Sequence, residues 1–296
     1  MGRHRELIVF IDVTAFLVLT LVFLPCLASD GLQVRVWTDK EQFLLHEPIP
    51  VHYMATNTSD SITYTPDFYE TEENICITDD KGREYYSHIR TSSQFGYPFP
   101  PGETHRATLD VHTTYDVENV GEYTCFVMVW THFACFNSQR INSNTIKFKV
   151  VEPKGDEKEA LNLLLEAKDL AGVDTNLGYP NPGKEELAVL KCKEIVNKYP
   201  NGVYSPMGLL TAIEIFARWQ EHTKRLIPIC VRLIEHYPGY YYWDEGFSHL
   251  VESYESLQDK EGAIKTMQEL IEKHPNTKIS ERAEYWLEKI EKWEFK

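Results

Sequence analysis

A phrase that is written three times in the C-terminal half constrains the fold of this chain more than any other feature. The segments KEIVNKYPNG, VRLIEHYPGY and QELIEKHPNT place their prolines at Pro200, Pro238 and Pro275, at intervals of 38 and 37 residues. Apolar residues stand four and five positions before each proline. A small residue stands eight positions after each proline: Gly208, Gly246 and Ala283. The pattern predicts a helix, a turn at the proline and a second helix, repeated with a period typical of helical-repeat proteins.

Repetition of this kind has a physical reason. A single helical hairpin cannot bury its apolar face alone, whereas stacked hairpins bury a continuous core. The pattern extends upstream to DEKEALNLLLEAKDLA (156–171) and ends in SERAEYWLEKIEKW (280–293). Residues 156–296 are therefore predicted to form three helical hairpins and a closing helix. The small residue after each proline is expected to let one helix backbone approach its neighbour closely.

Local signals inside the repeats give sharper predictions. Ser205, directly before Pro206, is predicted to cap the start of a helix, and Ser280 occupies the same place in the last copy. Pro228 lies inside the second helix of the second hairpin, where a proline is expected to kink the helix. The connection GVDTNLGYPNPG (172–183) is long for a helical hairpin and is interpreted as an ordinary loop.

Residues 31–152 have a different pattern, in which short runs of β-branched and aromatic residues are separated by turn residues. In the first run, Leu32, Val34 and Val36 alternate with polar residues, which is typical of a strand with one buried face. Seven or eight such strands predict an all-β sandwich. The boundary between the two domains is predicted near VVEPKGDEKEA (150–160).

The stretch PPGETHRATLDVHTTYDVENVGEYTCFV (100–127) resembles part of the immunoglobulin-like sandwiches of exported bacterial proteins. A similar pattern occurs in the β-rich regions of some deuterolysin-type proteases. The resemblance implies that Tyr115 sits at a corner and that Tyr123 opens a late strand. It implies a fold and no activity.

In the helical half, YESLQDKEGAI (254–264) resembles the turn of tetratricopeptide repeats. The xLIxxYPxx phrase resembles the exported tetratricopeptide proteins of bacterial envelopes, such as the Tol–Pal coordinator and the tetratricopeptide lipoprotein of the outer-membrane assembly machine. This resemblance covers Glu185 to Lys292, and it implies that Tyr254 packs inside the repeat and that Ala263 lets two helices close on each other. The predicted fold class is therefore multidomain β plus α: an immunoglobulin-like β-sandwich followed by an α-helical, tetratricopeptide-like solenoid.

Residues 1–28 are predicted to direct export. Arg3 and Arg5 precede an uncharged run whose apolar core, VTAFLVLTLVFL, is followed by Pro25 and then by CLA before Ser29. A core of this length suits a signal peptide better than a helix that crosses a membrane. The alternative is an uncleaved N-terminal membrane anchor. In both cases the body of the protein is expected outside the cytoplasm: periplasmic, secreted, or anchored to the membrane and facing outward.

The formal net charge of −15 argues against nucleic acid as a partner, because binding to phosphates needs clustered lysine and arginine. The acidic excess is spread along both halves of the chain and is interpreted as a solvated surface.

The cysteines are interpreted separately in the two halves. Cys192 and Cys230 stand eight residues before their prolines, where the third copy has Met267. They are predicted to be equivalent core positions of neighbouring repeats, too far apart for a disulfide. Three further cysteines lie in the predicted sandwich: Cys76, Cys125 and Cys135. Two of these three can pair in an oxidising compartment, and the sequence leaves all three pairings open.

No catalytic residue, cofactor or metal site is predicted, and the protein is interpreted as a non-enzyme. HEPIPVH (46–52) carries two histidines, but Pro50 stands where a helical zinc-protease motif needs its second histidine. His132 lies near Cys135, yet no third residue is placed to orient the pair. A glycosylation sequon at Asn57 matters only in a eukaryotic source.

An aromatic cluster provides the candidate partner-binding residues: Tyr240, Tyr241, Tyr242 and Trp243. The corresponding segments of the other two copies read NGVYS and NTKIS and lack this run. Some of these rings are expected to pack between repeats, but four adjacent aromatic side chains cannot all turn inward. Tyrosine and tryptophan dominate binding hot spots, so this cluster is the predicted contact surface.

These features predict a non-catalytic protein–protein interaction or scaffold protein of the cell envelope, which binds a protein or peptide partner through its helical-repeat surface. A membrane contact is expected only through an uncleaved N-terminal segment. The competing hypothesis is an enzyme inhibitor or accessory module centred on the β-sandwich. A third hypothesis is a carbohydrate-binding module that uses exposed aromatic side chains of the sandwich: Phe95, Tyr97 and Phe99.

Overall fold

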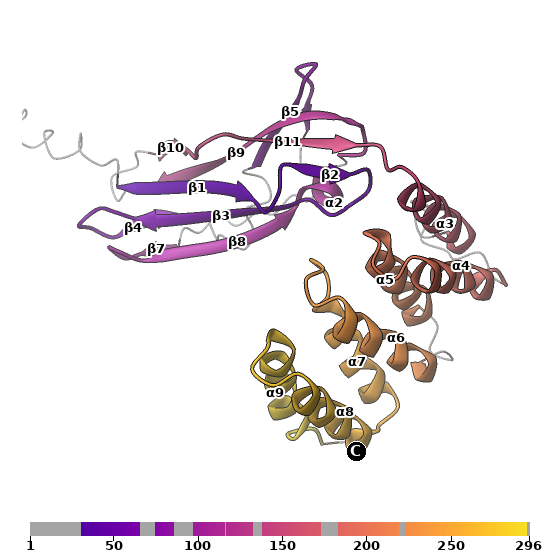
Figure 1. The fold of residues 1–296 in the computed structure, drawn as a ribbon. Helices are drawn as coiled ribbons and strands as arrows, with labels where there is room; N and C mark the ends of the chain where they lie inside the picture. Colours follow the sequence, from indigo (N-terminus) through magenta and orange to yellow (C-terminus); the bar gives the residue numbers. More distant parts are fainter. Residues whose placement is uncertain are drawn as a thin grey trace, which may run out of the picture. The chain divides into compact units, whose positions relative to one another are not determined.

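The computed structural model describes residues 31–65, 75–85, 97–115, 117–132, 138–172, 183–218 and 223–294. The chain divides into two compact units, Met1–Val150 and Val151–Lys296. The first is rich in strands and the second is helical (Figure 1). Within the described ranges, no helix combines the length and the apolar character needed to span a membrane. The predicted export segment, residues 1–28, lies outside these ranges.

Three strands form one antiparallel sheet: β1 (Leu32–Thr38), β3 (Pro50–Asn57) and β8 (Thr104–Asp110). β3 lies in the middle, where Val51 pairs with Thr38 on one side and with Leu109 on the other. Every second residue of β3 is buried, and Leu32, Val34 and Val36 of β1 are buried, as their alternation predicted. One face of this sheet therefore contributes to a core.

A second sheet has the strand order β2–β11–β9–β4–β7. These strands are β2 (Gln42–Leu44), β4 (Thr63–Thr65), β7 (Tyr97–Phe99), β9 (Gly121–His132) and β11 (Ile146–Val151). The long strand β9 also pairs with β5 (Ile75–Asp79) and β10 (Ser138–Asn142), and β5 pairs with β6 (Glu84–Tyr85). A short helix, α2 (Val111–Tyr115), follows β8. The N-terminal unit is thus β-rich, with two open sheets.

Side chains from both sheets share one buried core. Phe148 of β11 stacks on Tyr123 of β9, with 5.4 Å between the ring centroids, and meets Phe43 edge to face at 6.0 Å. The Tyr123 hydroxyl donates a hydrogen bond of 2.6 Å to the backbone oxygen of Asn119, and burial raises the pKa of this phenol well above its usual range. Tyr115, at the end of α2, is buried in the same core. Tyr123 therefore fixes the loop that leads into β9.

Asn57, the asparagine of the sequon, is buried at the end of β3. Its Nδ2 donates to the backbone oxygens of Ser61 (2.9 Å) and Phe99 (2.6 Å). Its Oδ1 accepts hydrogen bonds from the backbone nitrogen and the hydroxyl of Ser59. Buried polar groups are stable only when they are paired in this way. Because both amide hydrogens are used, this side chain organises the fold and is not accessible to a glycan.

In the described residues, seven helices make up the second unit: α3 (Asp156–Ala171), α4 (Glu185–Lys198), α5 (Tyr204–Ala217), α6 (Thr223–His236), α7 (Glu245–Ser256), α8 (Lys260–Lys273) and α9 (Lys278–Ile290). They are the three hairpins and the closing helix that the repeated phrase predicted (Figure 1). We call α3, α5 and α7 the A helices and α4, α6 and α8 the B helices. Residues 173–182 of the predicted long loop lie outside the described ranges.

The small residue lies where two helices approach closely in the first two copies, at Gly208 and Gly246. A Cβ added at Gly208 of α5 would lie 3.3 Å from the backbone oxygen of Cys192 on α4. A Cβ added at Gly246 would lie 3.0 Å from Ile234 Cγ1 and 3.5 Å from the backbone oxygen of Cys230 on α6. Since Cys192 and Cys230 are equivalent in the repeat, the same backbone approach occurs twice, which confirms the prediction.

The two predicted serine caps are wrong. α5 begins at Tyr204, whose side chain is fully buried, so Ser205 lies inside the first turn, and its hydroxyl donates to the backbone oxygen of Tyr199. α9 is capped by Thr277, which exchanges hydrogen bonds with Ser280 three residues later. In both copies the helix begins before the predicted serine. Pro228 lies inside α6, as the sequence predicted.

Candidate functional site

The predicted binding residues 240–243 form the connection between α6 and α7. Tyr240, Tyr242 and Trp243 are half-buried and pack against the core of the helical unit. Trp243 meets Phe247 edge to face, with 5.7 Å between the ring centroids. Tyr241 is not among the residues that pack on this core, and its ring stands edge-on to Tyr242 at 4.6 Å. Tyr241 is half-buried like the other three residues, and it differs from them in that it does not pack against this core.

The acidic residues after the cluster have partners inside the unit. Asp244 accepts two hydrogen bonds of 2.6 Å from Arg282 of α9, and the Arg282 guanidinium also lies 4.8 Å from the centre of the Tyr285 ring. Burial raises the pKa of Glu245, and the neighbouring carboxylates of Glu214 and Asp244 add to this effect. The start of α7 is thus tied to the closing helix.

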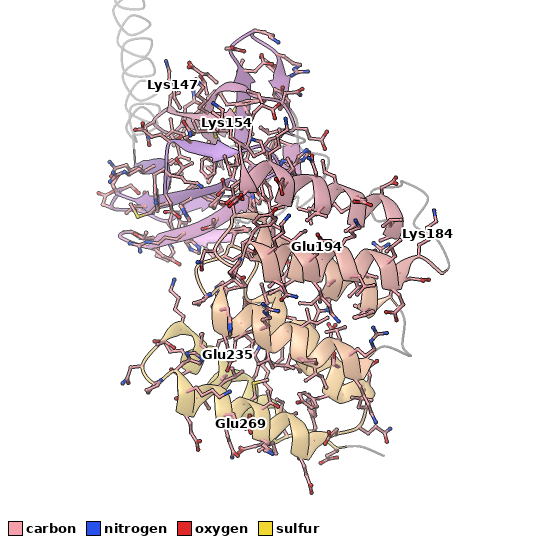
Figure 2. The ribbon with its side chains drawn as sticks, turned by 45° about the vertical axis from the view of Figure 1, so that its right-hand side comes forward. Lys147, Lys154, Lys184, Glu194, Glu235 and Glu269 are labelled. Atoms are coloured by element: carbon pink, nitrogen blue, oxygen red, sulfur yellow. The ribbon has the colours of Figure 1, made fainter. Side chains whose placement is uncertain are left out.

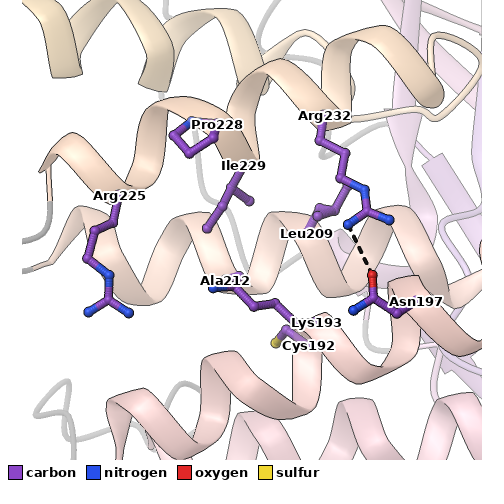
Figure 3. Close-up of a pocket in the computed structure, with 9 residues that line it drawn as sticks. All are labelled: Cys192, Lys193, Asn197, Leu209, Ala212, Arg225, Pro228, Ile229 and Arg232. Carbon is purple, nitrogen blue, oxygen red and sulfur yellow. Dashed lines mark hydrogen bonds between the residues drawn. The ribbon is translucent and has the colours of Figure 1, made fainter.

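A groove of about 290 Å³, which the sequence did not predict, lies between α4, α5 and α6 (Figure 3). Its floor consists of four buried residues: Cys192, Leu209, Ala212 and Ile229. Its rim consists of five residues that are exposed or half-buried: Lys193, Asn197, Arg225, Pro228 and Arg232. We call it the α4–α6 groove. It combines an apolar floor with a rim that carries three positive charges.

The three bases of the rim are engaged to different degrees. Arg225 forms a two-pronged ion pair with Glu186, in which Nη2 lies 2.8 Å from Oε2, and this carboxylate raises the pKa of Arg225. Arg232 donates one hydrogen bond of 3.3 Å to Asn197 Oδ1, which Figure 3 shows as a dashed line. Lys193 has no ion-pair partner within the described ranges. Two of the three charges are therefore not neutralised by a carboxylate of the described chain.

One column of the repeat that lines the groove contains a smaller residue in the first copy than in the other two. Twelve positions after the proline, the first copy has Ala212 where the other two have Leu250 and Leu287. Leu250 is fully buried between its helices. Alanine has a smaller side chain than leucine and therefore fills less of the space beside α4 and α6. The smaller residue is visible in the sequence, but it does not by itself show that residues of three helices meet there.

The thiol in the groove floor is not set up for catalysis. Burial raises the pKa of Cys192 to about 12, so the reactive thiolate is scarce at neutral pH. Cys192, Cys230 and Met267 are all buried, which confirms their prediction as core positions. Across the described residues, no three His, Cys, Asp or Glu side chains gather in a way that could hold a metal ion.

The other residues considered from the sequence lie apart from one another. His52 contacts Thr108 Oγ1 through Nδ1 (2.8 Å) and Asp39 through Nε2 (3.1 Å). No disulfide joins Cys76 to Cys125, and Cys135 lies outside the described ranges. The side chain of His132 also lies outside them.

The carbohydrate-binding hypothesis loses one of its three aromatic residues. Phe99 is buried, and its ring lies 4.9 Å from the His105 ring. It belongs to the core because β7 pairs with β4 and turns this residue inward. The expectation that Phe99 is exposed is therefore wrong. Phe95 and the side chain of Tyr97 lie outside the described ranges.

A model of the tetratricopeptide repeat matches residues 248–277, from α7 through α8 to the turn before α9. In agreement with the match, Tyr254 and Ala263 are buried where α7 and α8 meet. The C-terminal helical region is therefore tetratricopeptide-like. A tetratricopeptide repeat indicates protein–protein interaction and, in general, a protein partner.

The chain matches no curated protein. Among solved structures it is similar to the C-terminal domain of wzt (9% identity, 43% of this chain and 77% of that chain, TM-score 0.31). It is also similar to the sporulation control protein Spo0M of Bacillus subtilis (13%, 48% and 56%, TM-score 0.28). A third is the CARDB domain of a Pyrococcus furiosus protein (12%, 40% and 87%, TM-score 0.26). At these TM-scores the similarities carry no argument about fold or function.

Proposed function

We propose that the protein is an exported, non-catalytic scaffold of the cell envelope that binds a protein or peptide partner through the surface of its A helices. The observation that carries this proposal is the stack of three hairpins with a tetratricopeptide match in the last one. Stacked repeats of this kind create extended concave surfaces, which such proteins use for binding.

Tyr241, in the connection that leads into the A helix α7, is the contact residue that we favour at the edge of this surface. The other three rings of the cluster pack on the core, whereas Tyr241 is held edge-on by Tyr242 without joining that core. A tyrosine fixed by its neighbours loses little side-chain entropy when a partner covers it, which favours a role as a binding anchor. Asp244 is bound to Arg282 and is therefore not assigned to a partner.

For the strand-rich unit we propose an immunoglobulin-like sandwich. The order β1–β3–β8 in one sheet, and β11–β9–β5 in the other, corresponds to the division of strands between the two sheets of that fold. The hydrogen bond from the Tyr123 hydroxyl back to Asn119 has the form of a tyrosine corner, another feature of such sandwiches. In this proposal the unit supports or positions the helical unit and has no catalytic role.

Export is proposed from residues 1–28 alone, as a signal peptide or as an anchor. Sequencing of the N-terminus of the protein from its native host should begin near Ser29 or Asp30 if the segment is a signal peptide. An intact Met1 in a membrane fraction would indicate the anchor. An intact Met1 in the soluble cytoplasmic fraction would contradict export.

The binding proposal is tested with two neighbouring tyrosines. Tyr241→Ala should reduce the recovery of partner proteins from an envelope extract several-fold and leave the melting temperature nearly unchanged. Tyr242→Ala is the matched control: it removes a ring that packs on the core, so the melting temperature should fall by several degrees. Unchanged recovery with Tyr241→Ala, at a wild-type melting temperature, would refute the assignment of this site.

A further inference from the structure

We propose that the α4–α6 groove is a second binding site, for an acidic peptide segment with one large apolar side chain. The apolar side chain occupies the floor, and aspartate or glutamate residues on either side of it pair with Lys193 and Arg232. The site lies between the B helices α4 and α6, and the A helix α5 completes its floor. Its lining does not include Tyr241, the contact residue favoured above.

The size and lining of the groove select the apolar part of the ligand. An apolar cavity of about 150 Å³ in a protein core holds a benzene molecule, and the groove has a volume of about 290 Å³. It therefore accommodates one leucine, methionine or phenylalanine side chain together with part of a peptide backbone. Leu209, Ala212 and Ile229 offer only apolar atoms there, so a polar side chain would lose its hydrogen bonds with water on entry.

The charges of the rim select the acidic part. Lys193 and Arg232 carry positive charges that no described carboxylate neutralises, in a chain whose net charge is −15. The charge of Arg225 is already shared with Glu186. Two flanking positive charges beside an apolar floor complement a peptide with acidic residues next to an apolar one. Such complementarity determines which partner binds and how fast it associates.

Asn197 provides a contact for the peptide backbone. Its Oδ1 accepts the hydrogen bond from Arg232 Nη1 (Figure 3), which turns the amide nitrogen away from that arginine. The Nδ2 group has no acceptor within the described residues. An exposed amide donor at the rim, next to a cation, is suited to a carbonyl oxygen of an extended peptide. This favours a peptide over a small anionic molecule.

The equivalent positions in the next repeat lack these features. Val231 replaces Lys193, and Glu269 of α8, labelled in Figure 2, replaces Arg232. Glu235 replaces Asn197, and it forms an ion pair of 3.1 Å with Lys273. The positive charges and the amide beside the groove are therefore not repeated at the equivalent positions of the next copy.

The test is a selection of peptides from a display library of random short sequences on the full chain. Peptides that also bind the charge-reversed variant Lys193→Glu/Arg232→Glu are removed in each round. The surviving peptides should be enriched in Asp and Glu around a central Leu, Met or Phe. A set of survivors without this enrichment, or no survivors at all, would overturn the proposal.

The best peptide is then synthesised with a fluorescent label, and its affinity is measured by anisotropy. Lys193→Glu/Arg232→Glu should weaken binding at least about tenfold, since like charges now face each other. The control Lys158→Glu/Lys224→Glu makes the same change of charge at exposed lysines outside the groove, and it should change the affinity less than about twofold because long-range charge effects are screened by salt. Equal losses for the two variants would refute specific pairing in the groove.

Ala212→Leu tests the groove without a change of charge, because it introduces the residue that the next copy carries. The variant should lose peptide binding about tenfold or more and keep or raise its melting temperature. Tyr241→Ala should bind the peptide with wild-type affinity, so that failure at one site is distinguishable from failure at the other. Wild-type affinity of Ala212→Leu for the peptide would overturn the assignment to this groove.

Discussion

The junction between the first two hairpins and the junction between the last two have the same backbone arrangement but different interiors. In each, a glycine of the A helix lies against the backbone oxygen of a cysteine on the preceding B helix. The side chains beside that contact differ: Leu209 and Ala212 at the first junction become Phe247 and Leu250 at the second, and the latter two are fully buried. The repeat therefore keeps the close approach of the helices at both junctions, and the side chains beside that approach are larger at the second.

The most direct test of this difference places at the second junction the alanine that the first junction carries. Leu250→Ala should lower the free energy of unfolding of the helical unit by about 2–5 kcal/mol, because it removes a fully buried side chain and leaves a cavity. Urea denaturation followed by circular dichroism measures the loss. The matched control, Leu190→Ala at a position that is 58% exposed, should cost less than about 0.5 kcal/mol. A loss below about 1 kcal/mol for Leu250→Ala would mean that the second junction is not tightly filled.

The two cysteines test the same difference between the junctions, because Cys192 lines the groove and Cys230 does not. Cys230→Ser should cost about 1–3 kcal/mol, since it places a hydroxyl among apolar side chains. Cys192→Ser should cost less, because water in the groove can bind the new hydroxyl. A maleimide reagent should also label Cys192 faster than Cys230 in the folded protein, and reducing agents should not alter either stability. Faster labelling of Cys230 would reverse the assignment of which junction is open.

Alkaline pH provides a test without mutation of the groove. Burial raises the pKa of Cys192 to about 12 and raises that of Cys230 as well. In the unfolded chain these thiols ionise near pH 8.5. As the pH rises above that value, the thiols lose their protons in the unfolded state before they do so in the folded state. The contribution of the buried thiols to the free energy of unfolding is therefore complete below about pH 8.5, and it is lost as the pH rises towards the pKa of the folded state. Between about pH 8 and 9.5 each thiol should cost the helical unit about 1 kcal/mol.

Cys230→Ala measures how much one thiol contributes to the loss of unfolding free energy at alkaline pH. The variant should show a smaller loss of stability than the wild type over the same interval of pH, as measured by urea denaturation. Identical losses in the variant and the wild type would contradict burial of the Cys230 thiol.

The variant with the smallest expected effect gives the first junction the leucine of the second. Ala212→Leu should raise the free energy of unfolding by about 0.5–1 kcal/mol, because the new side chain fills free volume and buries more apolar surface. Thermal denaturation measures the change. A clear loss of stability would show that the groove is narrower than its volume suggests and that the leucine overpacks it.

The repeat made much of the helical unit predictable. Apolar columns at a fixed distance from a proline gave seven helices in order, and DEKEALNLLLEAKDLA (156–171) coincides with α3. The first residues of the helices were less predictable. Tyr204 is buried in the core, and α5 begins at this residue, before Ser205. Local capping preference is worth about 1 kcal/mol, which is less than the burial of a whole tyrosine side chain contributes.

The groove could not be predicted because its parts come from three helices. Lys193, Ala212 and Arg232 are each unremarkable in their own segments, and only the packing of α4, α5 and α6 brings them together. The aromatic cluster was visible because its residues are adjacent in the chain. Its adjacency did not reveal which ring stays outside the core, since that depends on the packing of Tyr240, Tyr242 and Trp243 against other helices.

The burial of Asn57 has a consequence for how this protein can be produced. In a eukaryotic secretion host, the sequon is available to glycosylation while the nascent chain is still extended. A glycan attached at that moment would occupy the nitrogen that must later donate to Ser61 and Phe99. The Asn57 side chain therefore cannot both carry a glycan and make the hydrogen bonds that it makes in the folded strand-rich unit. A bacterial host, in which the sequon is left unmodified, is the appropriate choice for preparing the folded protein.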